Sequence, residues 1–246
     1  MKKQSRCMVL VLLSIIAGVN PVSAEDIKSV DDQLNKRQRA IVAISALTAK
    51  GNQQALAPEI GKGLDAGLTI NEVKEILVQL AAYAGFPRSL NAINSLKKTM
   101  DERIAKGIND PVGPQPLALD STANRYELGK ANLEKLSGKA EGNTKAGYAV
   151  VVPVIEVFLK EHLFADIFSR GVLSYQDREL VTVSALTSLG GVESQLQGHL
   201  GLSMYNGLTV PQLTQMLDIV ANLVGKKEAE DGQLVLKKVA DAQKKK

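Results

Sequence analysis

The sequence predicts an all-α protein built from two tandem copies of one helical module. Apolar residues recur at helical spacing through nearly all of the chain after residue 24, and no stretch shows the alternation of a half-buried strand. The composition agrees, because alanine, leucine, valine and isoleucine dominate while aromatic residues make up 4% and tryptophan is absent. Small aliphatic side chains of this kind suit closely packed helices. The third observation is an internal duplication.

One block of residues occurs twice, 139 residues apart. The first copy carries Leu34, Arg39, Val42, Ser45, Ala46, Leu47, Thr48 and Gly51, and the second carries Leu173, Arg178, Val181, Ser184, Ala185, Leu186, Thr187 and Gly190. After a slip of one residue the match resumes, with Gly61 against Gly201 and residues 67–69 against residues 207–209. Each copy therefore serves as a control for the other.

The first copy predicts four helices. The first spans residues 34–50 and is broken at Gly51, and the second runs to about residue 66 and stops before Gly67. Thr69 and Glu72 form a capping box for the third helix, which continues to residue 83. Residues 85–87 turn the chain, because the glycine supplies backbone freedom and the proline suits the first turn of a helix. A fourth helix is expected over residues 88–106.

The second copy is expected to repeat this order after a linker. Residues 107–123 hold three prolines and two glycines, a helix is predicted over residues 124–136, and a loop over residues 137–148. A long amphipathic helix over residues 150–169 ends at Gly171. The remaining helices are expected over residues 174–189, 192–206 and 209–224, with a last one to about residue 242, and Thr209 is again the N-cap.

The N-terminus has the pattern of a secretory signal peptide. Basic residues precede an apolar run over residues 8–19, and residues 22–24 (Val-Ser-Ala) form a small-residue cleavage site. The alternative is an uncleaved membrane anchor. We expect a signal peptide over residues 1–24, a first module over 25–106, a linker over 107–123 and a second module over 124–246. The mature protein would be periplasmic or secreted.

Removing this leader excludes several classes of function. The one cysteine, Cys7, lies within it, so the mature chain would have no disulfide, no thiolate catalysis and no thiolate metal site. The net charge would fall from +4 to +1, and no basic face indicates a nucleic-acid partner. No later stretch is apolar for long enough to cross a membrane.

Several blocks in a fixed order resemble the carboxymuconolactone decarboxylase family. They cover almost all of the mature chain. In the first copy they are residues 73–77, Gln79 and the run Tyr83-Ala84-Gly85-Phe86-Pro87; later they are Arg125, Tyr126, Gly129, Leu136, residues 166–170, Leu173, residues 177–181, Ala185, Leu186, Leu196, His199, Asn206 and Gly207.

The resemblance implies a compact helical fold that assembles into trimers or hexamers. Two fused copies would then form a trimer of tandems. It also implies either lactone decarboxylation or a peroxidase activity like that of the alkylhydroperoxidase-D-like relatives. The peroxidase branch needs two cysteines on the helix that carries the catalytic histidine. Val192 and Gln195 stand at those positions here, which argues against peroxidase chemistry.

His199 and Glu179 are the candidate catalytic residues. Histidine exchanges protons near neutral pH, and His199 is one of two in the chain. Glu179 replaces an alanine of the first copy, Ala40, and shares a helix face with apolar residues, so it should point inward and be partly desolvated, as suits a general acid or base. The resemblance implies that the two form a proton relay. The alternative is a surface glutamate paired with Arg178 or Lys160.

Each copy lacks what the other has. Ala40 and Glu59 stand for Glu179 and His199 in the first copy, and the second copy has no counterpart of the residue 83–87 run. One interpretation is a composite site that joins Tyr83 and Phe86 to the histidine and glutamate. The alternative is drift, with residues 85–87 acting only as a turn.

We therefore expect candidate substrate-binding roles for Arg170, Gln195 and Tyr83. Arg170 could hold a carboxylate, or it could cap its own helix. His162 lacks further ligands at suitable spacing, so no metal and no cofactor are expected. The leading interpretation is a cofactor-free lyase that acts on a small carboxylated or lactone substrate. The alternative is a ligand-binding or assembly protein without turnover.

Overall fold

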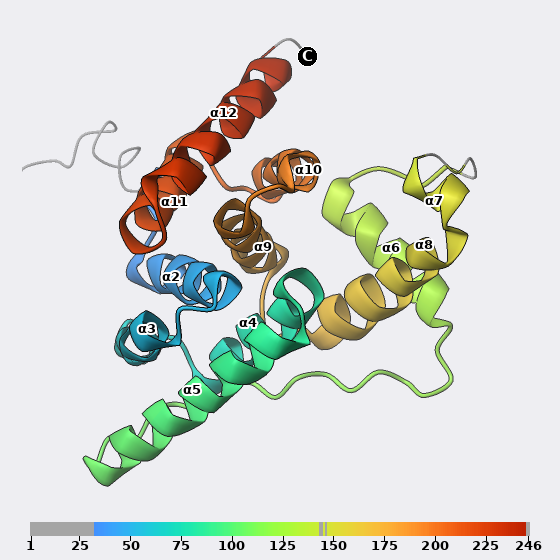
Figure 1. Ribbon diagram of the computed structural model, residues 1–246. Helices are drawn as coiled ribbons and strands as arrows, with labels where there is room; N and C mark the ends of the chain where they lie inside the picture. Colours follow the sequence, from blue (N-terminus) through green and yellow to red (C-terminus); the bar gives the residue numbers. More distant parts are fainter. Residues whose placement is uncertain (1–31, 143–144, 146, 245–246) are drawn as a thin grey trace, which may run out of the picture. The chain divides into compact units, whose positions relative to one another are not determined.

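The computed structural model describes residues 32–142, 145 and 147–244 (Figure 1). These residues form helices and loops, with no strand among them. The first copy contains α2 (Lys36–Lys50), α3 (Gln53–Asp65), α4 (Ile70–Ala84) and α5 (Phe86–Ala105), and the second contains α9 (Tyr175–Leu189), α10 (Glu193–Tyr205), α11 (Val210–Leu223) and α12 (Lys226–Gln243). The predicted all-α fold with two tandem helical modules is confirmed.

The N-caps predicted at Thr69 and Thr209 are both present. Thr69 accepts a hydrogen bond from the backbone of Glu72, whose side chain bonds back to Thr69. Thr209 forms the same capping box with Gln212. These bonds satisfy backbone N–H groups that have no partner inside the helix.

The turn over residues 85–87 also matches its prediction. Gly85 has φ +84° and ψ 154°, a backbone conformation that is open essentially to glycine alone. Helix α5 starts directly after it, with Pro87 in its first turn, two residues earlier than expected. Phe86 is 61% exposed, so its side chain does not belong to the hydrophobic core and residues 85–87 act as a surface turn.

The two copies share one hydrophobic core. Helices α2 and α9, which correspond to each other, pack together (Figure 1). Both are buried over most of their length. Helix α4 of the first copy packs on α9, and α11 of the second copy packs on α2. This reciprocal exchange relates the copies by an approximate two-fold and places residues of both copies at the same corners.

In the sequence, five elements of the described residues separate the two copies: α6 (Arg125–Ser137), α7 (Tyr148–Val151), α8 (Pro153–Phe158), the π-helix η1 (Leu159–Ile167) and the 3₁₀ turn η2 (Phe168–Arg170). Helix α6 packs closely on η1, because Gly129 has no Cβ and a Cβ there would overlap the carbonyl oxygen of Lys160. Residues 107–123, the predicted linker, contain no helix.

The prediction of one continuous helix over residues 150–169 is wrong. The chain breaks at Val152, which has φ −131° and ψ 79°, because the following Pro153 has no N–H and excludes helical geometry at the residue before it. The apolar residues up to the end of α8 are mostly exposed, including Val154 and Phe158. In contrast, Phe164 and Phe168 are buried in a second, smaller hydrophobic core.

The predicted signal peptide lies outside the described residues. Within the described ranges, no helix is long and apolar enough to cross a membrane.

Candidate functional site

The central feature of the site is a contact between α9 and α10. His199 Nδ1 lies 2.8 Å from Glu179 Oε2. The side chain of Glu179 is fully buried, while that of His199 is 15% exposed. The inward orientation predicted for Glu179 is therefore correct, and the imidazole lies between this carboxylate and the solvent.

Burial of Glu179 is costly unless its oxygens are bonded. Oε2 has His199, but Oε1 is buried and accepts no hydrogen bond from the described residues. A buried acceptor without a donor costs about 1–3 kcal/mol. Such groups in folded proteins call for an explanation, and a functional site is one.

Tyr83 comes to this site from the first copy. Its ring meets the ring of His199 edge-on, with centroids 5.6 Å apart and an interplanar angle of 80°. Its hydroxyl is buried beside Thr182 without a hydrogen bond of good geometry. Burial raises the pKa of Tyr83 well above its usual range, and the negative charge of Glu179 raises it further. The hydroxyl therefore stays protonated. We call Tyr83, Glu179 and His199 the His199 corner.

A buried polar cluster fixes the helix that carries Tyr83. Gln79 Nε2 donates to the carbonyl of Arg178 at 2.8 Å and to the hydroxyl of Thr182 at 2.9 Å, and its oxygen accepts from Arg178 Nη1 at 3.0 Å. Arg178 is fully buried, and Glu75 lies 3.5 Å from its Nη2. These contacts join α4 of the first copy to α9 of the second, one turn from Tyr83.

Arg170 is held by a carboxylate of the protein itself. Its Nε lies 2.9 Å from both oxygens of Glu75, and its side chain is 32% exposed. The interaction replaces the capping role that was one alternative for Arg170. A substrate carboxylate would have to compete with Glu75, so the substrate-binding role of Arg170 stays a prediction.

Gln195 lies one turn before His199 on α10, and it is exposed. Its role also stays a prediction. His162, the other histidine, lies 3.6 Å from Asp166 with 51% of its side chain exposed. Among the residues that the structure describes, no group of three histidine, cysteine or acidic side chains could hold a metal ion.

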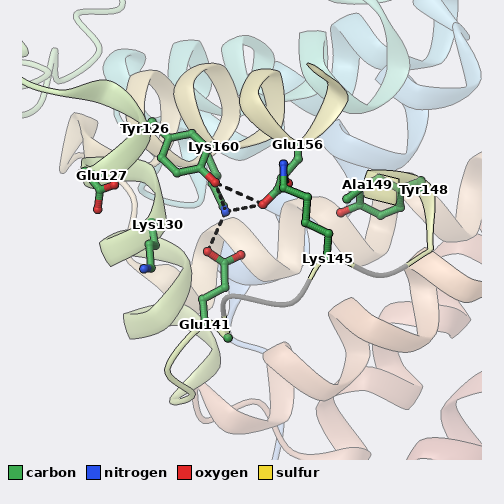
Figure 2. A pocket seen from close by; sticks show the side chains of 10 residues that line it. Tyr126, Glu127, Lys130, Glu141, Lys145, Tyr148, Ala149, Glu156 and Lys160 are labelled. Carbon is green, nitrogen blue, oxygen red and sulfur yellow. Dashed lines mark hydrogen bonds and ion pairs between the residues drawn. The ribbon is translucent and has the colours of Figure 1, made fainter. Parts of the chain in front are cut away.

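The surface alternative for Glu179 is wrong, because its side chain is fully buried and both suggested partners pair elsewhere, Arg178 with Glu75 and Lys160 with two other glutamates. Lys160 Nζ lies 2.7 Å from Glu141 and from Glu156, and 2.8 Å from the hydroxyl of Tyr126. Figure 2 draws these three contacts as dashed lines. Lys160 and Lys145 lower the pKa of Glu156 to about 2. These residues line a cavity of about 460 Å³ beside α6 and α8. Because the ammonium group already has three partners, this cluster is best explained as a structural anchor for α8.

Both copies match a known protein family. A model of the carboxymuconolactone decarboxylase family matches residues 18–98 and, a second time, residues 156–237. The chain belongs to the carboxymuconolactone decarboxylase family. No curated protein matches the chain significantly. Membership in the carboxymuconolactone decarboxylase family establishes the relationship and the duplication, and it leaves the reaction and substrate to be argued from the site.

The polar cluster behind this site was not predicted from the sequence. Arg178 is expected there only as a surface partner of Glu179, and its ion pair with Glu75 is not expected at all. The duplication held a usable signal, because Glu75 corresponds to Gln215 and Arg178 to Arg39. Arg39 Nη2 indeed donates to Gln215 Oε1 at 3.2 Å, so the same pairing occurs twice.

Proposed function

We propose that this protein is a cofactor-free enzyme that transfers protons to and from a small carboxylated or lactone substrate, with decarboxylation as the leading reaction. The observation that carries the proposal is the 2.8 Å contact between a fully buried glutamate and a histidine at the edge of solvent. A general acid or base needs a neighbour that fixes its orientation and supports its charged form, and Glu179 supplies both.

The geometry supports a role for each residue of the pair. With Glu179 at Nδ1, the imidazole presents Nε2 to a substrate, and Nε2 makes no hydrogen bond with the described residues. When the bond to the carboxylate carbon breaks, CO₂ leaves and the electron pair stays on carbon as an enolate conjugated with the substrate carbonyl. The protonated imidazole gives its Nε2 proton to that carbon, and water restores the proton in the next cycle. Glu179 stabilises the imidazolium.

Tyr83 has a positioning role in this proposal. Its ring limits the orientations open to His199, and its protonated hydroxyl is a donor without a partner near Glu179. The site would then be composite, since the tyrosine comes from one copy and the acid–base pair from the other. Phe86 is left out because it is turned to solvent.

Export and assembly complete the proposal. The leader-like pattern of residues 1–24 supports export to the periplasm or beyond. The duplication supports a trimer of tandems, because each chain already contains two modules. A mass spectrum of the secreted protein starting at Glu25 and light scattering that gives three chains are the expected results. An intact N-terminus or a strict monomer would contradict these two points.

A non-catalytic binding function is the second candidate. The first copy keeps the helices but lacks the acid–base pair, since Ala40 and Glu59 occupy the positions of Glu179 and His199. The fold therefore persists without this chemistry in half of the same chain.

The test is a screen followed by a rate measurement. Purified protein is mixed with lactones, keto acids and aromatic acids, and ligands that raise the melting temperature are taken to a proton NMR assay for substrate loss. For an accepted substrate, His199→Ala should lower the rate about 100-fold or more. His162→Ala is the matched control, because His162 also contacts a carboxylate but lies exposed, and it should retain full activity. Full activity in His199→Ala would overturn the proposal.

A further inference from the structure

The first copy has a cavity at the position that corresponds to the His199 corner. Its volume is about 380 Å³, and its floor includes Ala40, Ala43, Ile219 and Leu223. In the duplication these residues correspond to Glu179, Thr182, Gln79 and Tyr83, in that order. We call it the Ala40 cavity.

The cavity exists because the polar cluster is missing on this side. In the second copy, the space at this place is filled by the buried carboxylate of Glu179, the ring of Tyr83 and the amide of Gln79 with its bonds to Thr182. Alanines and aliphatic side chains replace them in the first copy, where α2 packs on α11 as α9 packs on α4. The result is an apolar basin where the other copy has a packed acid–base site.

The rim of this basin is cationic. Lys36, Arg39 and Lys62 line it, against one carboxylate, Glu59. Glu59 lies 2.6 Å from Lys62 and neutralises that ammonium group. The hydrogen bonds of Arg39 within the described residues go to neutral oxygens, the carbonyl of Leu34 and the amide of Gln215, both at 3.2 Å.

Lys36 makes no ion pair within the described residues, so Arg39 and Lys36 both keep an uncompensated positive charge beside the apolar lining. A guanidinium binds a carboxylate through two parallel hydrogen bonds, and an apolar basin of roughly 300–1,000 Å³ is the size at which small ligands bind. The charge and the surface together fit a molecule with one anionic end and one apolar end.

We propose that the Ala40 cavity is a second, non-catalytic binding site for small monocarboxylates with an aromatic or aliphatic body. Arg39 and Lys36 hold the carboxylate, and Ala40, Ile219 and Leu223 contact the apolar body. The site stands apart from the proposed catalysis, because it uses neither Glu179 nor His199. One half of the chain then turns a substrate over while the related half binds an acid without acting on it.

Calorimetric titration of the purified protein with 2-naphthoate tests this site. The neutral amide 2-naphthamide is the matched ligand, since it has the same apolar body without the charge. We expect 2-naphthoate to bind at least about 10-fold more tightly than the amide, because only the acid can form the charge-assisted bonds to Arg39. Arg39→Gln should weaken 2-naphthoate binding by a similar factor, and Ala40→Leu should weaken both ligands by filling the basin.

Arg125→Gln is the control variant. Arg125 is an exposed arginine in α6 that pairs with Asp166, and neither residue lines the Ala40 cavity. It should bind 2-naphthoate like the parent. Thermal melts confirm that each variant is folded, and Arg39→Gln alters an exposed side chain, so its fold should be retained.

Three results with the parent protein and Arg39→Gln would overturn the proposal. They are no binding of 2-naphthoate at millimolar concentration, equal binding of the acid and the amide, or binding that Arg39→Gln leaves unchanged. If binding is instead lost in His199→Ala, the acid occupies the His199 corner, and this inference fails while the proposed function stands. If 2-naphthoate binding depends on Arg39 but His199→Ala keeps full turnover, the Ala40 site stands and the proposed function fails.

Discussion

The His199 corner and the Ala40 cavity are the same place in two copies of one module, and they differ in nearly every side chain that carries chemistry. The helices around them begin and end at corresponding residues, as α3 (Gln53–Asp65) and α10 (Glu193–Tyr205) show. At the His199 corner a buried carboxylate contacts an imidazole. At the Ala40 cavity an alanine lines a basin of about 380 Å³. The difference indicates that the helices and their packing do not depend on the acid–base pair.

A second contrast lies behind these sites. Arg178 is fully buried against Glu75, whereas its counterpart Arg39 is exposed and bonds to the neutral amide of Gln215. The pairing of an arginine on the first helix with the third helix of the other copy is common to both. Only on the side of the His199 corner does it involve a buried ion pair, which ties α4 and Tyr83 to α9.

The largest expected effect is on catalysis at the carboxylate. Glu179→Gln keeps the size of the side chain but removes its charge, so the imidazolium loses its support and the rate should fall roughly 100- to 10,000-fold. The matched control is Asp166→Asn, which removes the carboxylate from the exposed contact with His162. NMR rates on the substrate found by screening measure both. Equal rates in the two variants would show that the buried Glu179–His199 pair contributes no more to the reaction than the exposed Asp166–His162 pair.

Stability should separate the two arginines. Arg178→Met leaves Glu75 buried with Arg170 as its remaining partner, and loss of one member of a buried ion pair costs about 3–5 kcal/mol of unfolding free energy. Arg39→Met changes an exposed side chain and should cost less than about 1 kcal/mol. Urea unfolding followed by circular dichroism gives both values. Similar costs at the two positions would show that the two-fold relation extends to their energetics.

The smallest effect concerns the turns that precede the last helix of each copy. Gly85→Ala should cost roughly 1–3 kcal/mol, because φ +84° with ψ 154° is strained for any residue with a Cβ. Gly225 has φ 169°, which is extended backbone, and a Cβ there would meet only the end of the flexible Glu228 side chain. Gly225→Ala should therefore be nearly neutral. Thermal melts measure the melting temperature of both variants. An equal decrease would mean that Gly85 and Gly225 are equally tolerant of a Cβ.

Much of the fold follows from local signals in the sequence. The capping box at Thr69, the glycine stops and the helical spacing place the helices to within a few residues, because these features act over one turn of chain. The exception is residues 150–169, where the apolar pattern continues through Pro153 but the backbone cannot. A periodic pattern shows which side chains could share a face, and it does not show that the helix is continuous.

The site was predictable only in part. The duplication shows that Glu179 points inward, since Ala40 occupies the same position. The 2.8 Å contact with His199 depends on how α9 and α10 cross, and the contact with Tyr83 depends on the exchange of helices between copies. The burial of Arg178 was not predicted, because charged side chains usually lie at the protein surface. Its burial is made possible by Glu75 and Gln79, which lie about 100 residues away in the sequence.

The most direct test of proton transfer at the His199 corner is a double-mutant cycle on kcat/KM with His199→Ala, Glu179→Gln and the double variant. If the two residues act as one proton-transfer unit, the double variant should be no slower than the slower single variant, because either change alone already disables the unit. If the two losses multiply, the residues act independently, and if His199→Ala retains the parent rate, the assignment of proton transfer to this corner is wrong.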